Sequence, residues 1–276
     1  MKRSRGAALL LVMWLVLLLS GLVAGYALAA RIESLQGNGS ARGVVAREAA
    51  RAGIEYAASR MLDPDPKQRW VPDGRGYRFP FDGVQVEVEV RDEAGKIDLN
   101  GAPPDLLAGL FVQLGEPREK AAQLAGAIVD WRDPDALSQP TGGAEDPAYA
   151  SAGLAWGAKD APFETVAEVE QVLGMRPALY AAAAPHLTVY TGSNAPDGNS
   201  ADDIVRAAMG LGERLPPADP QAPPAIGGSG TYSIDSRARL ADGRSAHLSV
   251  VLRMGGDGLP GSTYTPLRWQ TGSASP

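Results

Sequence analysis

Hydrophobic and polar residues are sharply separated at the start of the chain. Three basic residues, Lys2, Arg3 and Arg5, precede Gly6, and the residues that follow, 7–30, are uncharged and mostly apolar. A helix needs about 20 apolar residues to cross roughly 30 Å of hydrocarbon, so this segment is long enough to span a bilayer. Because basic flanks stay on the cytoplasmic side of a membrane, the pattern places the bulk of the chain outside the cytoplasm.

Three interpretations of this segment are open. A secretory signal would use residues 9–19 as its apolar core and the Ala-Leu-Ala sequence at 27–29 as its cleavage site. A plain transmembrane anchor would keep the whole apolar run. A prepilin-type leader would be cut between Gly6 and Ala7, which leaves the hydrophobic helix at the new N-terminus.

The next pattern predicts an amphipathic helix. From Ser40 to Leu62, apolar residues recur close to every 3.6 positions, and the Asp-Pro-Asp-Pro run at 63–66 predicts the end of the helix. The Gly-Asn-Gly sequence at 37–39 favours a hinge or local melting just upstream, because glycine readily adopts non-helical conformations.

Strict alternation of apolar and polar residues then predicts a half-buried antiparallel strand at 84–91, with residues 77–81 as its hairpin partner. A hydrophobic N-terminal helix, an amphipathic continuation and antiparallel strands are the architecture of a pilin. Many anchored α+β domains have the same pattern.

Residues 96–190 are predominantly helical in pattern and fall into two similar halves. Each half has a helix, a glycine-centred turn and a second helix, with the turns at 115–117 (Gly-Glu-Pro) and 174–177 (Gly-Met-Arg-Pro). This plan is typical of helix-hairpin-helix modules, many of which bind DNA through backbone amides. Here proline removes an amide donor from each turn, and Glu116 would repel phosphate. With a net charge of −6, the sequence argues against a nucleic-acid partner.

The C-terminal part predicts further strands. A linker rich in proline and glycine at 215–230 is followed by strand-like segments at 232–240 and 246–254, with a turn at Asp242-Gly243 between them, and at 264–270.

Composition excludes several kinds of chemistry. The chain has no cysteine, so it forms neither a disulfide framework nor a thiolate nucleophile. With only His186 and His247, a metal centre of several histidines is excluded. His186 is expected at a helix end, and His247 at the start of a surface strand.

An acidic loop is the strongest candidate for a binding site. Five carboxylates fall within the 17 residues from 130 to 146: Asp130, Asp133, Asp135, Glu145 and Asp146. Calcium takes six to eight oxygen ligands from loops of this kind, although the spacing is not that of an EF-hand. Capping of turn amides by aspartate explains part of the cluster equally well.

Taken together, these motifs resemble those of the K-type minor pseudopilin of the bacterial type II secretion system. The resemblance covers the whole chain and is carried by the Arg5-Gly6 junction and by the segments at 52–55 (AGIE), 96–102 (KIDLNGA), 130–135 (DWRDPD), 143–146 (GAED), 162–163 (PF) and 172–175 (VLGM). It implies an α+β, pilin-like fold with a large inserted α-helical domain of helix-hairpin-helix character.

The implied organisation has five parts. They are a leader (1–6), a transmembrane and filament-packing helix (7–30), the pilin-like helix and first strands (31–95), the inserted helical domain (96–214), and a linker with the C-terminal strands (215–276).

The resemblance also implies a function that is not enzymatic. Such a protein lies at the tip of the pseudopilus, where it initiates or caps the filament for export of folded proteins. The implied partners are the I-type, J-type and major pseudopilins, the inner-membrane assembly platform, and the prepilin peptidase, which would cut between Gly6 and Ala7 before methylation. The implied location is the inner membrane, single-pass, with the bulk in the periplasm. A structural Ca²⁺ in the acidic loop is part of the same expectation.

Leu11 fits a tip position. Most pilin-type proteins carry a glutamate at the fifth mature residue, where it pairs with the amine of a neighbouring subunit, but cleavage after Gly6 puts Leu11 there. A carboxylate at membrane depth costs about 2.5–3.5 kcal/mol on insertion scales. A subunit with no neighbour above it has no partner for such a carboxylate, so leucine is expected.

Two other functions are alternatives. The first is a membrane-anchored or secreted helix-hairpin-helix binding protein, and the second is a calcium-dependent hydrolase.

Overall fold

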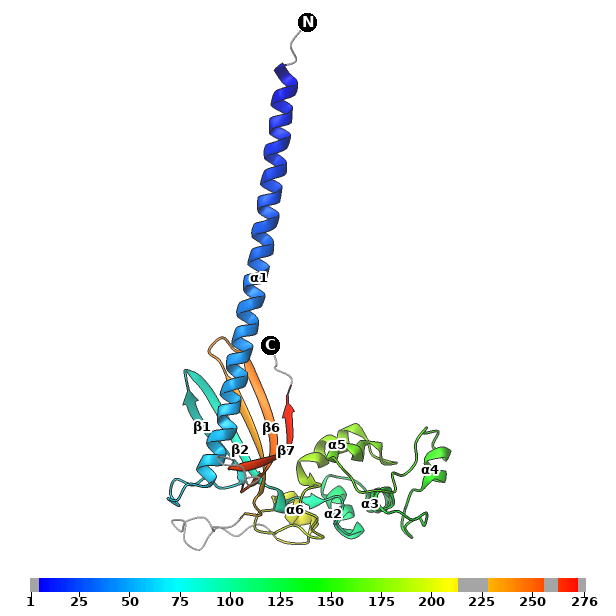
Figure 1. Cartoon of the computed structure of the whole chain (residues 1–276). Helices are drawn as coiled ribbons and strands as arrows, with labels where there is room; N and C mark the ends of the chain where they lie inside the picture. Colours follow the sequence, from blue (N-terminus) through cyan, green and yellow to red (C-terminus); the bar gives the residue numbers. More distant parts are fainter. Residues whose placement is uncertain (1–4, 213–227, 256–262, 273–276) are drawn as a thin grey trace.

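The computed structural model describes residues 5–212, 228–255 and 263–272 (Figure 1). It consists of a long N-terminal helix, an antiparallel sheet, and a helical region inserted between two central strands of that sheet. The first four residues of the expected leader, and residues 215–227 of the expected linker, lie outside the described residues.

Helix α1 (Arg5–Met61) runs without a break for 57 residues. The expected hinge at 37–39 is therefore wrong: the helix continues through Gly37 and Gly39. Each glycine costs only about 1 kcal/mol relative to alanine, and propagation from an existing helix is far easier than nucleation. Within the described residues, one helical stretch, Leu9–Ala29, is long and apolar enough to cross a membrane.

The sheet is five-stranded and antiparallel, in the order β1-β2-β5-β6-β7. The predicted alternation at 84–91 is confirmed, since every valine of β2 from Val84 to Val90 is buried. The hairpin partner and the three C-terminal strands are also confirmed. The strands are β1 (Asp73–Phe81), β2 (Val84–Asp92), β5 (Thr231–Arg239), β6 (Ser245–Met254) and β7 (Tyr264–Thr271).

The C-terminal half of α1 packs across β2, β5 and β6. Its buried face consists of Ile54 and of small residues, namely Ala46, Ala49, Ala50, Gly53 and Ala57. At Gly53 the backbone comes so close to the sheet that an added Cβ would collide with Ser236 Oγ and lie 2.9 Å from Val86 Cγ1. Close packing on the sheet therefore favours glycine at this position of the AGIE segment.

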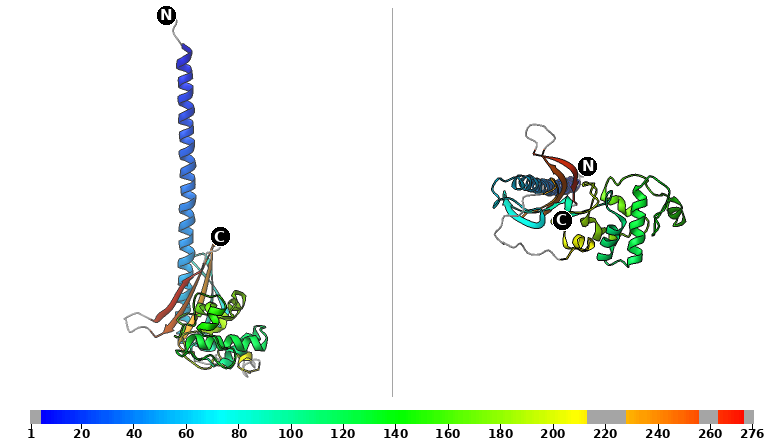
Figure 2. Two further views of the ribbon diagram at one scale, coloured as in Figure 1. Left: turned by 90° about the vertical axis from the view of Figure 1, so that its right-hand side faces the viewer. Right: turned by 90° about the horizontal axis from the view of Figure 1, so that it is seen from below.

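The helical region has a hydrophobic core of its own, around Leu107, Phe111, Ile128, Trp131 and Tyr149. In Figures 1 and 2 it lies beside the end of the sheet that is farthest from the N-terminus. Its elements are η1 (Glu93–Gly95), β3 (Ile97–Asp98), α2 (Pro104–Gln113), α3 (Arg118–Arg132), α4 (Asp146–Ser151), η2 (Val166–Gln171), α5 (Pro177–Ala183), η3 (Ala184–His186), β4 (Leu187–Thr188) and α6 (Asp203–Ala208).

The two predicted hairpins differ in detail. The first is α2 and α3 joined through Gly115, which has a positive φ of 92°. In the second, the helix before Gly174 is the 3₁₀ helix η2 rather than an α-helix. Only six residues separate its Thr165 cap from the extended Val172, and short segments of this kind favour 3₁₀ geometry. An ion pair between Glu116 and Arg176 joins the two turns.

A buried polar network fixes the helical region to the sheet. Glu93 pairs with Lys96, which also donates to Ser233 Oγ of β5 at 2.9 Å. Thr188 of β4 donates its hydroxyl to the second oxygen of Glu93. The short parallel pair β3–β4 is thereby held against the main sheet.

Candidate metal centre

The acidic loop begins where α3 ends. Arg132, the last residue of α3, donates through its guanidinium to the carbonyl oxygens of Leu99 and Ala102, the latter at 2.7 Å. Asp133 then turns to extended backbone, with φ −86° and ψ 150°. The ring of a proline sterically disfavours the helical conformation for the residue before it, so Pro134 favours the end of the helix at this point.

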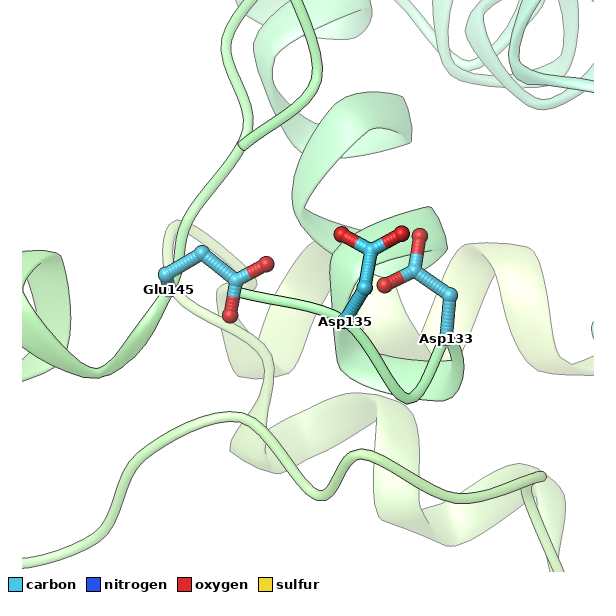
Figure 3. A group of neighbouring side chains, drawn as sticks. All are labelled: Asp133, Asp135 and Glu145. Carbon is cyan, nitrogen blue, oxygen red and sulfur yellow. The ribbon is translucent and has the colours of Figure 1, made fainter. Parts of the chain in front are cut away.

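Three carboxylates of this loop come together. Asp133 and Asp135 follow α3, and Glu145 is the N-cap residue of α4. One oxygen atom from each lies within 4.8 Å of the other two. Figure 3 shows the three side chains facing a common space.

Two carboxylate oxygens at the cluster are buried and unsatisfied. Among the described residues, neither Asp133 Oδ1 nor Glu145 Oε1 has a hydrogen-bond partner, and Glu145 is only 8% exposed. An unpaired buried polar atom costs about 1–3 kcal/mol, and more when it is charged. A cation bound between the three carboxylates would satisfy both atoms.

Electrostatics points the same way. Burial raises the pKa of Glu145, and the charges of Asp130 and Asp133 raise it further. Burial also raises the pKa of Asp133, together with the charge of Asp135. Like-charged carboxylates in close proximity must take up either protons or a cation. A set of carboxylate oxygens suits a hard cation such as Ca²⁺, so the residues present fit the expected metal.

Asp130 does not join these three carboxylates. Its side chain is completely buried in α3, and its Oδ1 accepts a hydrogen bond from the N–H of Gln139 at 3.1 Å. Burial raises the pKa of Asp130, although the N–H groups of Gln139 and Ala144 oppose that shift.

Asp146 also lies outside the cluster. It is the first residue of α4. A Cβ added to Gly157 would collide with its Oδ1, so its carboxylate lies against the backbone of that glycine.

Asp160 is a further carboxylate near the cluster, and no sequence motif predicted it. This residue has a left-handed backbone, with φ 55°, and its charge contributes to the raised pKa of both Asp133 and Glu145. Its proximity arises because the chain returns to the loop after α4, and no local pattern marks that return.

The KIDLNGA segment has a structural role. The buried Asp98 carboxylate accepts hydrogen bonds from the backbone N–H groups of Asn100, Gly101, Thr191 and Gly192. The Asn100 amide imitates a backbone pair: its Oδ1 accepts from Phe163 N at 2.7 Å and its Nδ2 donates to Phe163 O at 2.9 Å. These residues hold the loops of the helical region together.

Both histidines contact carboxylates. His186 Nδ1 lies 2.6 Å from Asp202 Oδ2, and His247 Nε2 lies 2.9 Å from Asp235 Oδ1. His186 ends η3, as expected of a helix end, and His247 lies in β6.

The candidate processing residues Gly6 and Ala7 lie in the first turns of α1. Leu11 follows on the same helix with its side chain exposed.

The expected resemblance to K-type pseudopilins was tested by comparison with known proteins. Residues 91–192 match the family model described as type II secretion system (T2SS), protein K. The resemblance to the protein K family of type II secretion is confirmed. The match covers the helical region, including the acidic loop and both hairpins.

Two relatives carry the same description. The type II secretion system protein K of Pectobacterium carotovorum subsp. carotovorum is 25% identical over 214 residues, which cover 67% of this chain and 62% of that protein. The protein K of Klebsiella pneumoniae is 27% identical over 158 residues, which cover 49% of this chain and 47% of that protein. The matches thus span less than two thirds of these relatives.

A solved structure has the same fold. One chain of the GspK-GspI-GspJ complex from the type 2 secretion system of enterotoxigenic Escherichia coli superposes with a TM-score of 0.62. The match covers 88% of this chain and 99% of that chain, at 17% sequence identity. The expected pilin-like α+β fold is therefore confirmed.

Proposed function

We propose that this chain is a minor pseudopilin at the tip of a type II secretion pseudopilus, where it initiates or caps the filament during export of folded proteins. The observation that carries the proposal is the unbroken helix α1. It joins a membrane-length apolar segment directly to a pilin-like sheet, and that sheet bears a protein K domain.

Shape supports the tip position. The helical region lies at the end of the sheet farthest from the membrane segment (Figures 1 and 2). In a filament whose subunits pack through parallel N-terminal helices, this bulk would occupy the place of a subunit stacked above this one, on the side away from the membrane. A subunit of this shape fits the end of a filament better than its middle.

Leu11 supports the same position. A membrane-depth carboxylate is useful only where a neighbouring subunit supplies a positive partner. Leucine at this position needs no such partner and suits the first subunit.

The partners proposed are the I-type and J-type minor pseudopilins, followed by the major pseudopilin and the inner-membrane assembly platform. The chain would lie in the inner membrane with a single span and with its bulk in the periplasm. The prepilin peptidase would cut between Gly6 and Ala7, and the new N-terminus would be methylated.

Assembly tests this function. When the full chain is co-expressed with the I-type and J-type pseudopilins of its own system, we expect a complex that survives purification in mild detergent. Deletion of the chain should reduce both pseudopilus formation and secretion. Normal filaments and normal secretion in the deletion strain would contradict the proposal.

We propose that the cluster of Asp133, Asp135 and Glu145 binds a structural Ca²⁺. At free calcium 100-fold above the dissociation constant, binding adds about 2.7 kcal/mol to the stability of the folded state. Calcium should therefore raise the melting temperature of the full chain in detergent. The double variant D133N/E145Q should lose this response, whereas D146N, outside the cluster, should keep it. An unchanged melting temperature with calcium would contradict the metal site.

A further inference from the structure

Asp130 occupies an unusual place beside the acidic cluster. It lies on α3 only three residues before Asp133, yet its carboxylate is fully buried and accepts hydrogen bonds from the loop backbone. Both of its oxygens lie within hydrogen-bond distance of Gln139 N, at 3.1 and 3.3 Å. Burying a carboxylate is costly in free energy unless its oxygens are hydrogen-bonded or paired. A carboxylate buried at this position is therefore expected to serve a structural or functional purpose.

The loop that Asp130 holds lies flat on α3. A Cβ added to Gly143 would collide with Asp130 Oδ2 and with the backbone nitrogen of Gln139. On the helix side, a Cβ added to Gly126 would lie 2.6 Å from the carbonyl oxygen of Thr141. Glycine on both surfaces therefore permits a direct backbone contact between the loop and the helix.

The backbone contact between the loop and α3 determines the position of Glu145. Asp133 and Asp135 directly follow α3, so the helix itself positions them. Glu145 is ten residues beyond Asp135 and reaches the cluster only because residues 139–144 are held in place. A free loop of this length would sample many conformations, and ordering it on metal binding would reduce the affinity.

We propose that Asp130 is a positioning residue for the cation site: it fixes residues 139–144 against α3, so that Glu145 is held opposite Asp133 and Asp135 before the cation arrives. This inference rests on the proposed Ca²⁺ site. It assigns Asp130 a role other than that of a ligand, and it explains a buried carboxylate that contributes no oxygen to the cluster.

Calcium titration of the full chain in detergent tests the proposal, with D130N as the main variant. Asparagine keeps the size of the side chain and one acceptor oxygen but loses the charge. Loss of a residue that orients a metal ligand typically weakens affinity 10- to 100-fold, and we expect a loss in this range. D105N, which removes a charge from the exposed first turn of α2, is the matched control and should bind as the wild type does.

Two further measurements separate positioning from ligation and from general destabilisation. Terbium luminescence lifetimes in H₂O and D₂O count the water molecules on the bound ion. The count should be unchanged in D130N and higher in D135N, which loses a ligand. Without metal, the Gln139 amide should exchange faster in D130N, whereas amides of α2 should be unaffected.

A second variant keeps the test valid if D130N folds poorly. G126A leaves every carboxylate in place but forces Thr141 away from α3, and it should also weaken calcium binding. Wild-type affinity in a folded D130N, or an additional bound water in that variant, would overturn the positioning role and leave the metal site standing. No calcium binding by the wild type would overturn the site itself.

Discussion

Replacing Gly53 by alanine tests how α1 packs on the sheet. Alanine is the better helix former by about 0.8–1.0 kcal/mol, so helix propensity alone predicts stabilisation. However, an added Cβ at this position would collide with Ser236 Oγ and lie 2.9 Å from Val86 Cγ1. Overpacking of this kind costs typically 1–3 kcal/mol. The net expectation for G53A is a loss of roughly 0–2 kcal/mol.

Gly43 supplies a matched control on the same helix. A Cβ added there meets no heavy atom within 4 Å, so G43A gains the propensity and incurs no packing cost. The propensity terms cancel in the difference between the two variants. The free energies of unfolding should therefore differ by about 1–3 kcal/mol, which is the packing cost at Gly53.

Hydrogen exchange of the β2 and β5 amides at increasing urea concentration is the suitable assay for the full chain in detergent. It reports on the sheet separately from the helical region, which has its own core. If G53A stabilises the sheet as much as G43A does, the claim that α1 packs too closely on the sheet at Gly53 to admit a Cβ is refuted.

Two further predictions concern the helical region. N100A removes both hydrogen bonds to the Phe163 backbone and should cost about 2 kcal/mol in urea unfolding, whereas the exposed Asn199 should tolerate alanine within about 0.5 kcal/mol; equal stabilities would contradict the backbone-like role of Asn100. Burial alone would raise the pKa of Glu168, but hydrogen bonds from Lys159 and from the N–H groups of the η2 cap outweigh burial and lower it from 4.5. A lowered pKa stabilises the fold above the ordinary value, and this contribution disappears as the pH falls through the lowered one. E168Q should therefore be less stable than the wild type near pH 7, with a difference that shrinks below about pH 4.5; a difference independent of pH would refute the charge-based explanation.

The periodicity of hydrophobic residues predicted the strands and helices that bury one face against the core. The valines at 84, 86, 88 and 90 identified β2 because alternate residues of a strand face the same side of the sheet. The same principle predicted β5 and β6. The inserted helices were also visible, but the 3₁₀ geometry of η2 depends on cap and length, which hydrophobic periodicity does not encode.

The error at residues 37–39 came from treating glycine as a local break. Helix formation is cooperative, and strong helical segments on both sides carry the backbone through an unfavourable pair of residues. A short sequence window around the two glycines does not include these flanking segments, so it does not reveal their stabilising effect.

The acidic loop was predictable as a group but not residue by residue. Asp133, Asp135 and Glu145 meet, whereas Asp130 lies on the buried face of α3. Helical spacing already contained that distinction, because Asp130 follows the buried Ala127 by three residues. Asp160 could not be found from sequence, since only the path of the chain after α4 brings it near the cluster.

The N-terminus of the mature protein tests the central claim most directly. Mass spectrometry of the full chain, purified from membranes of cells that contain the prepilin peptidase, should identify a first residue of Ala7 carrying a methyl group. A mature chain that begins near Ala30, or one that still carries Met1 to Gly6, would contradict the account of this protein as a processed pseudopilin.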